Sequence, residues 1–288
     1  MSGMMYFVKR NMLCFFRDKG AVFFSLMSVL IVVMLYLLFL RNMLIDSIVS
    51  GVEFASKEKL SNLVDAWVLS GILGIVAVSC SAGSLQSMVD DNLSGKRRDF
   101  IVTPMKPYEM AGGYVIATFF TGVVMSLITL AVALIYLFAT GCPMDMSSVL
   151  LCVLLLIPSA LSGSIILFAL VSRIRSNGAF TGFFTVVSVL IGFLTGIYMP
   201  MGSMNPVMQT IGTLVPATHM AALFRQYMCS SALKDVFGPY DTASFRKEMG
   251  FDLSIGGFDF TPATSIIYVL GVTAVFFIIA VMLVRKRQ

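Results

Sequence analysis

The stretch SLQSMVDDNLSGKRRDFIVTPMKPYEMAGG, residues 84–113, gathers charged residues between two long apolar runs. An apolar run of about 20 residues is long enough to cross the ~30 Å hydrocarbon core of a bilayer as a helix. The stretch therefore predicts a polar loop between two membrane spans. On both sides of this stretch, long apolar runs alternate with short charged segments along the whole chain. This alternation predicts further membrane spans joined by polar loops.

Composition gives the same class of protein. Hydrophobic residues make up 58% of the 288 residues and charged residues only 12%, whereas charged residues make up about 25% of a typical soluble domain. We predict an all-α integral membrane protein with six transmembrane helices, an N-terminal amphipathic interfacial helix and a re-entrant helical segment before the last span. The whole chain, 1–288, is expected to be a single transmembrane domain with spans at about 21–40, 64–88, 110–139, 149–171, 179–198 and 263–284.

The segment 4–19 predicts the interfacial helix. When it is plotted at 100° per residue, its apolar residues, which include Phe15 and Phe16, fall on one arc, and Arg10 and Arg17 fall opposite. Such a helix lies on the membrane surface with its cations toward anionic headgroups. A solvated basic N-terminus is the alternative.

Between the spans, we expect a polar connector at 41–63 and an external segment at 226–262 that forms a small packed hairpin. The second span is rich in small residues such as Ser70, Gly71 and Gly74. Small residues let helix backbones approach closely. This span is therefore predicted to pack in the centre of the bundle.

The segment 199–225, MPMGSMNPVMQTIGTLVPATHMAALFR, has a different character. Pro200, Pro206 and Pro216 exclude one continuous helix, yet only His219 interrupts its lack of charge before Arg225. Irregular backbone at membrane depth occurs where it is buried in protein or lines a cavity. We predict a re-entrant pair of short helices, with an ordinary amphipathic loop as the alternative.

The distribution of basic residues predicts the orientation. Most of the 20 Lys and Arg residues lie in the N-terminal segment, the 84–113 loop, the 172–178 turn and the C-terminal tail. By the positive-inside rule, both termini and the 84–113 loop are cytoplasmic. The net charge of +5 thus follows from topology, and no nucleic-acid partner is predicted.

Several function classes fit poorly. We expect the six spans to contain no Asp, Glu or Lys, which argues against proton-coupled transporters and cation channels. The single His excludes paired-His metal motifs, so no metal site is predicted. The five Cys residues have no regular spacing; Cys142 and Cys229 could form a bridge, but free thiols are the favoured reading.

Enzymatic motifs are weak. An intramembrane hydrolase would pair Ser162 or Ser70 with His219, but neither Ser has a Gly two residues before it. The pair Gly95-Lys96 is not a phosphate-binding loop, because no Gly stands five residues before Gly95 and an Arg follows the Lys. We therefore predict no catalytic and no cofactor-binding residue, and no ATP hydrolysis by this chain alone.

Short motifs in a fixed order nevertheless carry a resemblance. They are a basic amphipathic segment from Arg10 to Lys19, a cytoplasmic loop with Asp90, Asp91, Ser94 and Gly95 followed by Thr103-Pro104, and, late in the chain, Gly196–Pro200 (GIYMP) and Pro216–His219 (PATH) with Arg225. In this order they resemble the permease subunit of the ABC transporter type-2 family over nearly the whole chain. The chain departs from that pattern at 91–94, where DNLS lacks the family's basic neighbour of the acid.

The resemblance implies a separate cytoplasmic ABC ATPase subunit that binds ATP and Mg, a second permease that is identical or paralogous, and a lipid membrane, expected to be that of a prokaryotic cell. It also implies that the 84–113 loop docks on the ATPase and that the N-terminal helix braces it. The residues assigned to this coupling loop are Asp90, Asp91, Gly95, Lys96, Arg97, Arg98, Thr103 and Pro104.

The nature of the cargo follows only from the spans. Apolar spans rich in Met and Phe suit a hydrophobic or amphipathic compound, such as a drug, an antibiotic peptide or a lipid-like molecule, because Met surfaces adapt to varied shapes. Export of a polysaccharide or lipid-linked glycan is the alternative. A membrane scaffold or the hydrolase above is a weaker one.

Overall fold

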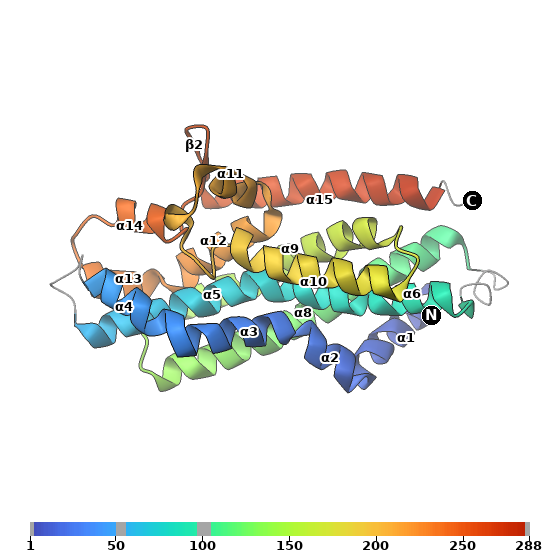
Figure 1. The fold of residues 1–288 in the computed structure, drawn as a ribbon, viewed down its shortest axis with the longest axis horizontal. Helices are drawn as coiled ribbons and strands as arrows, with labels where there is room; N and C mark the ends of the chain where they lie inside the picture. The colour runs from blue at the N-terminus through green and yellow to red at the C-terminus, as the bar shows by residue number, and fades with distance from the viewer. Residues whose placement is uncertain (1–2, 50–55, 97–104, 286–288) are drawn as a thin grey trace.

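The computed structural model describes residues 3–49, 56–96 and 105–285. Within these residues the chain is a bundle of helices that run along one long axis, with a single short hairpin at one side (Figure 1). The coupling-loop residues Arg97, Arg98, Thr103 and Pro104 lie outside the described residues.

The N-terminal quarter differs from the prediction of one interfacial helix and one span. Asp18 ends the first helix and caps the second, because its Oδ1 accepts a hydrogen bond of 2.9 Å from the Ala21 backbone N–H. The predicted span 21–40 is divided, and helix continues into the region predicted as a polar connector. The elements are α1 (Gly3–Arg17), α2 (Lys19–Ser25), α3 (Met27–Leu35), the π-helix η1 (Tyr36–Leu40) and α4 (Arg41–Val49).

The central spans begin and end close to the predicted limits, with one clear shift. The second span starts seven positions earlier than expected, at Lys57, where Ser56 caps the helix through a 3.4 Å hydrogen bond to the Lys59 N–H. The elements are α5 (Lys57–Ser84), α6 (Gln86–Leu93), α8 (Pro107–Ala139), α9 (Met146–Val171), α10 (Asn177–Leu194) and, at the C-terminus, α15 (Pro262–Arg285).

Two helices joined at a sharp bend occupy the segment that the three prolines interrupt. α11 (Pro206–Leu214) and α12 (Pro216–Met228) meet at 91°, and each begins with its proline in the first turn, where a missing N–H costs no hydrogen bond. The helix pair was expected; α12 extends three residues beyond the predicted end. The short 3-10 helix η2 (Met201–Ser203) precedes the pair.

Beyond the bent pair, the predicted external segment folds as two short helices and a hairpin. These are α13 (Ser230–Phe237), α14 (Ala243–Glu248), β1 (Ser254–Ile255) and β2 (Phe258–Asp259), and the two strands pair antiparallel. The small packed hairpin of the prediction is present, although helices make up most of the segment.

Within the described ranges, five helices are long and apolar enough to cross a membrane: α5 with α6, α8, α9, α10 and α15. The bent pair raises this number to six if it counts as one span. The first predicted span is not among them, because its helices are individually short. Large apolar side chains are exposed along the outer helices, among them Ile135, Ile267 and Ile278. Exposed apolar surface of this extent is typical of helices that face lipid.

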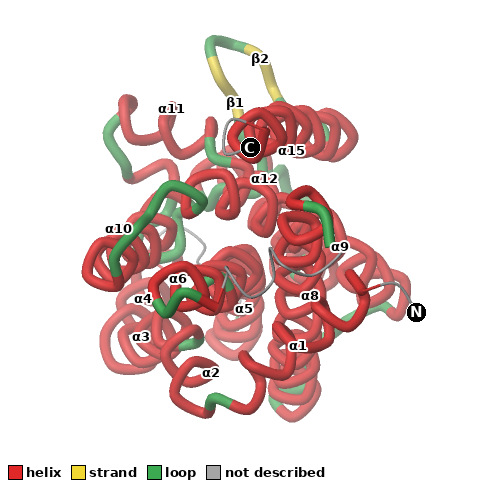
Figure 2. The backbone as a smooth tube through the Cα atoms, turned by 90° about the vertical axis from the view of Figure 1, so that its right-hand side faces the viewer, coloured by secondary structure: helices red, strands yellow, loops and turns green. Residues whose placement is uncertain are grey.

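α5 lies in the centre of the bundle, as predicted. Viewed along the bundle, it is surrounded by α8, α9, α12, α10 and α3 (Figure 2). Gly74 explains the close approach of α12, since a Cβ there would lie 2.7 Å from the Cβ of Ala221 and 2.9 Å from its Cα. The small residues of α5 therefore allow neighbouring backbones to pack directly against it.

The two ends of the bundle differ in their elements. One end, called here the α6 end, carries α1, α6, the first turns of α8 and the last turns of α15 (Figure 1). The opposite end, called the α13 end, carries α4, the start of α5, α13 and α14 (Figure 1).

Candidate functional site

The candidate site is a braced helix at the α6 end. α5 ends at Ser84, and after Leu85 the chain continues as α6, which carries Asp90 and Asp91 on successive positions. Successive positions of a helix point in different directions. Asp90 is exposed, whereas Asp91 is only 2% exposed.

Asp91 joins three separate elements. Its Oδ1 accepts a hydrogen bond of 2.7 Å from Nη2 of Arg10 in α1, and its Oδ2 accepts from Nη1 of the same guanidinium. Its Oδ2 also accepts a 2.7 Å hydrogen bond from the hydroxyl of Tyr114 in α8. The bidentate pair raises the pKa of Arg10 above its ordinary value. α6 is thus bonded to the N-terminal helix α1 and to α8 at one point.

Packing reinforces this three-way junction. The rings of Phe7 and Tyr114 meet edge to face with their centroids 4.9 Å apart. Gly113 makes room for this contact, because a Cβ there would lie 2.6 Å from Cδ1 of Phe7. α1 therefore rests directly on the first turns of α8, next to the Asp91 cluster.

A helix forms over most of the predicted segment 4–19, but its buried face overlaps the predicted apolar arc only in part. The buried stripe contains Phe7, Val8, Asn11 and Phe15, and Phe16 is half-buried against the core. Arg10 was expected to point toward headgroups and instead binds Asp91, whereas Arg17 is exposed. The spacing of the stripe, i, i+1, i+4, i+8, is that of a helix packed on a neighbour.

The remaining described coupling-loop residues lie at the free end of α6. Ser94 ends the helix, Gly95 follows with a positive φ of 77°, and Lys96 is exposed. Glycine adopts this left-handed conformation without the steric cost that other residues meet. The structure thus places Asp90, Gly95 and Lys96 on an accessible tip and Asp91 beneath it.

A second polar cluster lies toward the α13 end, and it corrects an expectation. Asp65 falls inside the predicted second span and is 1% exposed, so the spans are not free of acidic residues. It accepts hydrogen bonds from the Tyr36 hydroxyl, from Nε of Arg41 at 3.1 Å and from the Tyr136 hydroxyl at 3.2 Å. A buried carboxylate with an Arg and two Tyr partners is compensated by its neighbours. A lone Asp in an apolar run was the signal for this cluster.

The residues of the bent pair that we singled out fix its position. Arg225 is fully buried, and its guanidinium donates to the carbonyl oxygens of Thr195, Gly196 and Gly250 at 3.0 to 3.2 Å. It also lies over the ring of Trp67 at 4.7 Å. Arg225 thereby ties α12 to the end of α10, to the turn after α14 and to α5.

His219 has a structural environment too. Its Nε2 lies 2.8 Å from the carbonyl oxygen of Thr213 and its Nδ1 lies 3.3 Å from the hydroxyl of Ser265. The hydroxyls of Ser70 and Ser162 donate instead to carbonyl oxygens of their own helices. The nucleophile and base that the hydrolase alternative requires are therefore not brought together.

The described residues hold no group of three or more His, Cys, Asp or Glu side chains that could bind a metal ion. The five cysteines are unbridged: Cys14 is exposed, while the others, Cys142 and Cys229 included, are buried. What the α6 end offers is therefore an exposed tip on a rigid base, an arrangement suited to contact with another protein.

In a comparison with protein-family models, residues 40–282 match the model described as "ABC-2 family transporter protein". No curated protein matches the chain. The match runs from the start of α4 into the last turn of α15 and includes the bent pair.

Proposed function

Because the chain belongs to the ABC-2 family of transporter proteins and is a multi-pass membrane permease, we propose that it is the membrane-spanning subunit of an ATP-driven exporter. In this proposal a separate cytoplasmic ABC ATPase subunit binds ATP and Mg. The permease, a single domain, carries no catalysis of its own. Two permeases, identical or paralogous, pair with two ATPases in a prokaryotic cell membrane.

The observation that carries the proposal is the Asp91 junction. A helix that is to receive force from another subunit needs an exposed contact surface and a stiff connection to the spans. α6 has the first in Asp90, Gly95 and Lys96, and the second in the bonds of Asp91 to Arg10 and Tyr114. Closure of the ATPases would move α6 and α1 together, and α8 would pass the motion into the membrane.

The proposed orientation places the α6 end in the cytoplasm. The basic residues of the N-terminal segment and of the 84–113 and 172–178 connections support it by the positive-inside rule. α1 then lies at the inner membrane surface as an amphipathic helix. The bent pair α11–α12 enters from the outer side as a re-entrant segment, held by Arg225.

For the cargo, the apolar Met- and Phe-rich spans support a hydrophobic or amphipathic compound that moves outward. A drug, an antibiotic peptide or a lipid-like molecule has this chemistry.

The test reverses the charge of three consecutive basic residues, 96–98. The triple substitution Lys96→Glu, Arg97→Glu, Arg98→Glu is expected to abolish the stimulation of ATPase activity by the permease while membrane insertion stays intact. ATPase activity is measured on the co-purified complex in proteoliposomes, with insertion checked by protease protection. Undiminished transport by the triple variant would refute the proposed coupling role.

A matched control uses basic residues of another connection at the α6 end. Arg173→Glu with Arg175→Glu changes charge in the short turn after α9 and leaves α6 untouched. This double variant should retain stimulated ATPase activity.

A further inference from the structure

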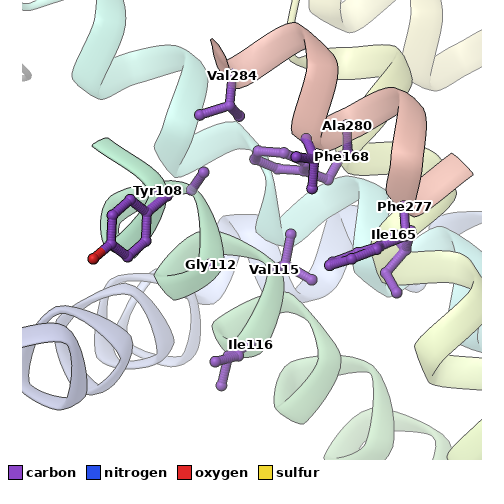
Figure 3. A pocket seen from close by; sticks show the side chains of 11 residues that line it. Tyr108, Gly112, Val115, Ile116, Ile165, Phe168, Phe277, Ala280 and Val284 are labelled. Carbon is purple, nitrogen blue, oxygen red and sulfur yellow. The ribbon is translucent and has the colours of Figure 1, made fainter. Parts of the chain in front are cut away.

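A pocket of about 470 Å³ lies at the α6 end of the bundle (Figure 1). Its walls come from the first turns of α8, the last turns of α9 and the last turns of α15 (Figure 3). Among its 11 lining residues the Tyr108 hydroxyl is the one polar side-chain group; the others are aliphatic residues, Phe and Gly. The volume and the apolar lining are those of ligand-binding pockets.

The pocket opens sideways between two spans. α15 packs mainly on α9 and only lightly on α8, so the two walls stand apart at this end. Ile165, Phe168 and Ala280 are buried and form the floor, whereas Tyr108 and Phe277 are more than half exposed and form the rim. A lateral opening between transmembrane helices faces lipid, so the occupant has to come from the bilayer.

The depth matches one leaflet. The lining of α8 runs from Tyr108 to Ile116, which is about 12 Å along a helix at ~1.5 Å per residue. One leaflet contributes about 15 Å to a hydrocarbon core of ~30 Å. An extended hydrocarbon chain that enters beside Tyr108 would therefore run along the pocket for most of the thickness of its leaflet.

The mouth carries a positive charge. The ammonium group of Lys106 lies 5.7 Å from the centre of the Tyr108 ring, on the rim. The neighbouring carboxylate of Glu109 accepts a 2.8 Å hydrogen bond from the Lys106 backbone N–H, as part of the cap of α8. Among the described residues, Lys106 has no ion-pair partner. A cation at the interface beside an apolar slot is suited to a phosphate headgroup.

We propose that this pocket holds one acyl chain of an anionic phospholipid, whose phosphate group pairs with Lys106. With the orientation proposed above, the lipid belongs to the cytoplasmic leaflet. The bound chain would wedge between α8 and α15 along the stretch of α8 that also carries Tyr114 of the Asp91 junction, so the lipid would stiffen the base on which α6 rests. The site is separate from the tip of α6 and does not depend on which cargo is exported.

The test uses phosphatidylglycerol with a photoreactive diazirine in its acyl chain, in nanodiscs that contain the full-length protein. Labelled peptides are located by mass spectrometry, and phosphatidylcholine with the same chain is the comparison. We expect labelling at 111–116 and 277–284 to be stronger with phosphatidylglycerol. Lys106→Gln should reduce that preference about fivefold, since one basic residue at a membrane surface contributes ~1 kcal/mol.

Ala280→Trp fills the floor of the pocket and should reduce labelling there about tenfold, which corresponds to ~1.4 kcal/mol. Ala274→Trp is the matched control, because Ala274 is exposed on the same helix and does not line the pocket. Labelling around Ile267, which is exposed on the same helix and does not line the pocket, reports that each variant remains folded in the membrane.

Three results would overturn the proposal. Equal labelling of wild type and Ala280→Trp would show that the chain does not occupy the pocket. Equal labelling by the two lipids would show that the pocket does not select an anionic headgroup. Crosslinks between two permease copies at 277–284, in place of lipid adducts, would assign the pocket to a protein interface. Each result leaves the ATPase assay of the coupling tip unaffected, so the two proposals fail separately.

Discussion

Asp90 and Asp91 show how two adjacent residues of the same type acquire different tasks. Asp91 is buried and bonded to Arg10 and Tyr114, whereas Asp90 is exposed and accepts a 2.9 Å hydrogen bond from Gln86. The difference is set by helical position alone. The carboxylate that faces inward joins three elements, and the one that faces outward is available to a partner.

Asp91→Ala is therefore expected to lower the free energy of unfolding in detergent by about 3 kcal/mol, since removal of one member of a buried ion pair leaves the other uncompensated. Asp90→Ala, its exposed neighbour, should change the same quantity by no more than ~0.5 kcal/mol. Denaturant unfolding followed by circular dichroism measures both. Similar values for the two variants would contradict the bracing role of Asp91.

The sequence allowed us to predict which residues matter at the α6 end, but it did not predict which residues they bind. Arg10 and Asp91 were both singled out, but they are 81 positions apart, and only the fold brings them together. Tyr114 and Tyr36 were missed, because a Tyr near the end of an apolar run carries no sign of its hydrogen-bond partner. The expectation that the spans contain no acidic residue was wrong at Asp65. Its ion pair with Arg41 is a tertiary contact that the sequence does not indicate.

At the scale of elements, α5 determines how closely its neighbours approach. Its glycines replace side chains with backbone contact, most tightly at Gly74 against Ala221. The sequence predicted this central position from the density of small residues. The first span was harder to predict, because the helix is interrupted at Leu26 within an apolar run that has no proline.

Gly74→Ala should destabilise the protein by about 1–3 kcal/mol, because the added methyl group has no space and overpacks the contact with α12. Gly182→Ala makes the same change in α10, where nothing lies within 4 Å of the new Cβ. It should be neutral or stabilising, since Ala is the better helix former by up to ~1 kcal/mol. Thermal unfolding of the two variants compares them directly, and equal losses would contradict the packing assigned to α5.

At the scale of the whole molecule, composition was enough to predict a helical membrane bundle, and the order of short motifs led to the family. The number of spans was less certain from sequence. The bent pair passes as one span only when both helices are counted together, and its 91° bend depends on contacts such as those of Arg225 that no local pattern specifies.

The proposed orientation, with the α6 end in the cytoplasm, can be tested by cysteine labelling. In a Cys14→Ser background the other four cysteines are buried, so a single introduced cysteine reports alone. Ser94→Cys at the α6 end should react with a membrane-impermeant maleimide only in inverted vesicles. Phe258→Cys in the hairpin should react only in right-side-out vesicles. The reverse pattern would invert the proposed topology.

The burial of α5 also has a consequence for biosynthesis. The helix is the second long apolar segment to leave the ribosome, yet its surroundings include α12, which begins only at Pro216. Membrane helices insert first and associate afterwards. We therefore expect α5 to insert before its neighbour α12 has been synthesised. Until more than half of the chain has been translated, Asp65 and the small residues of α5 face lipid or the insertion machinery.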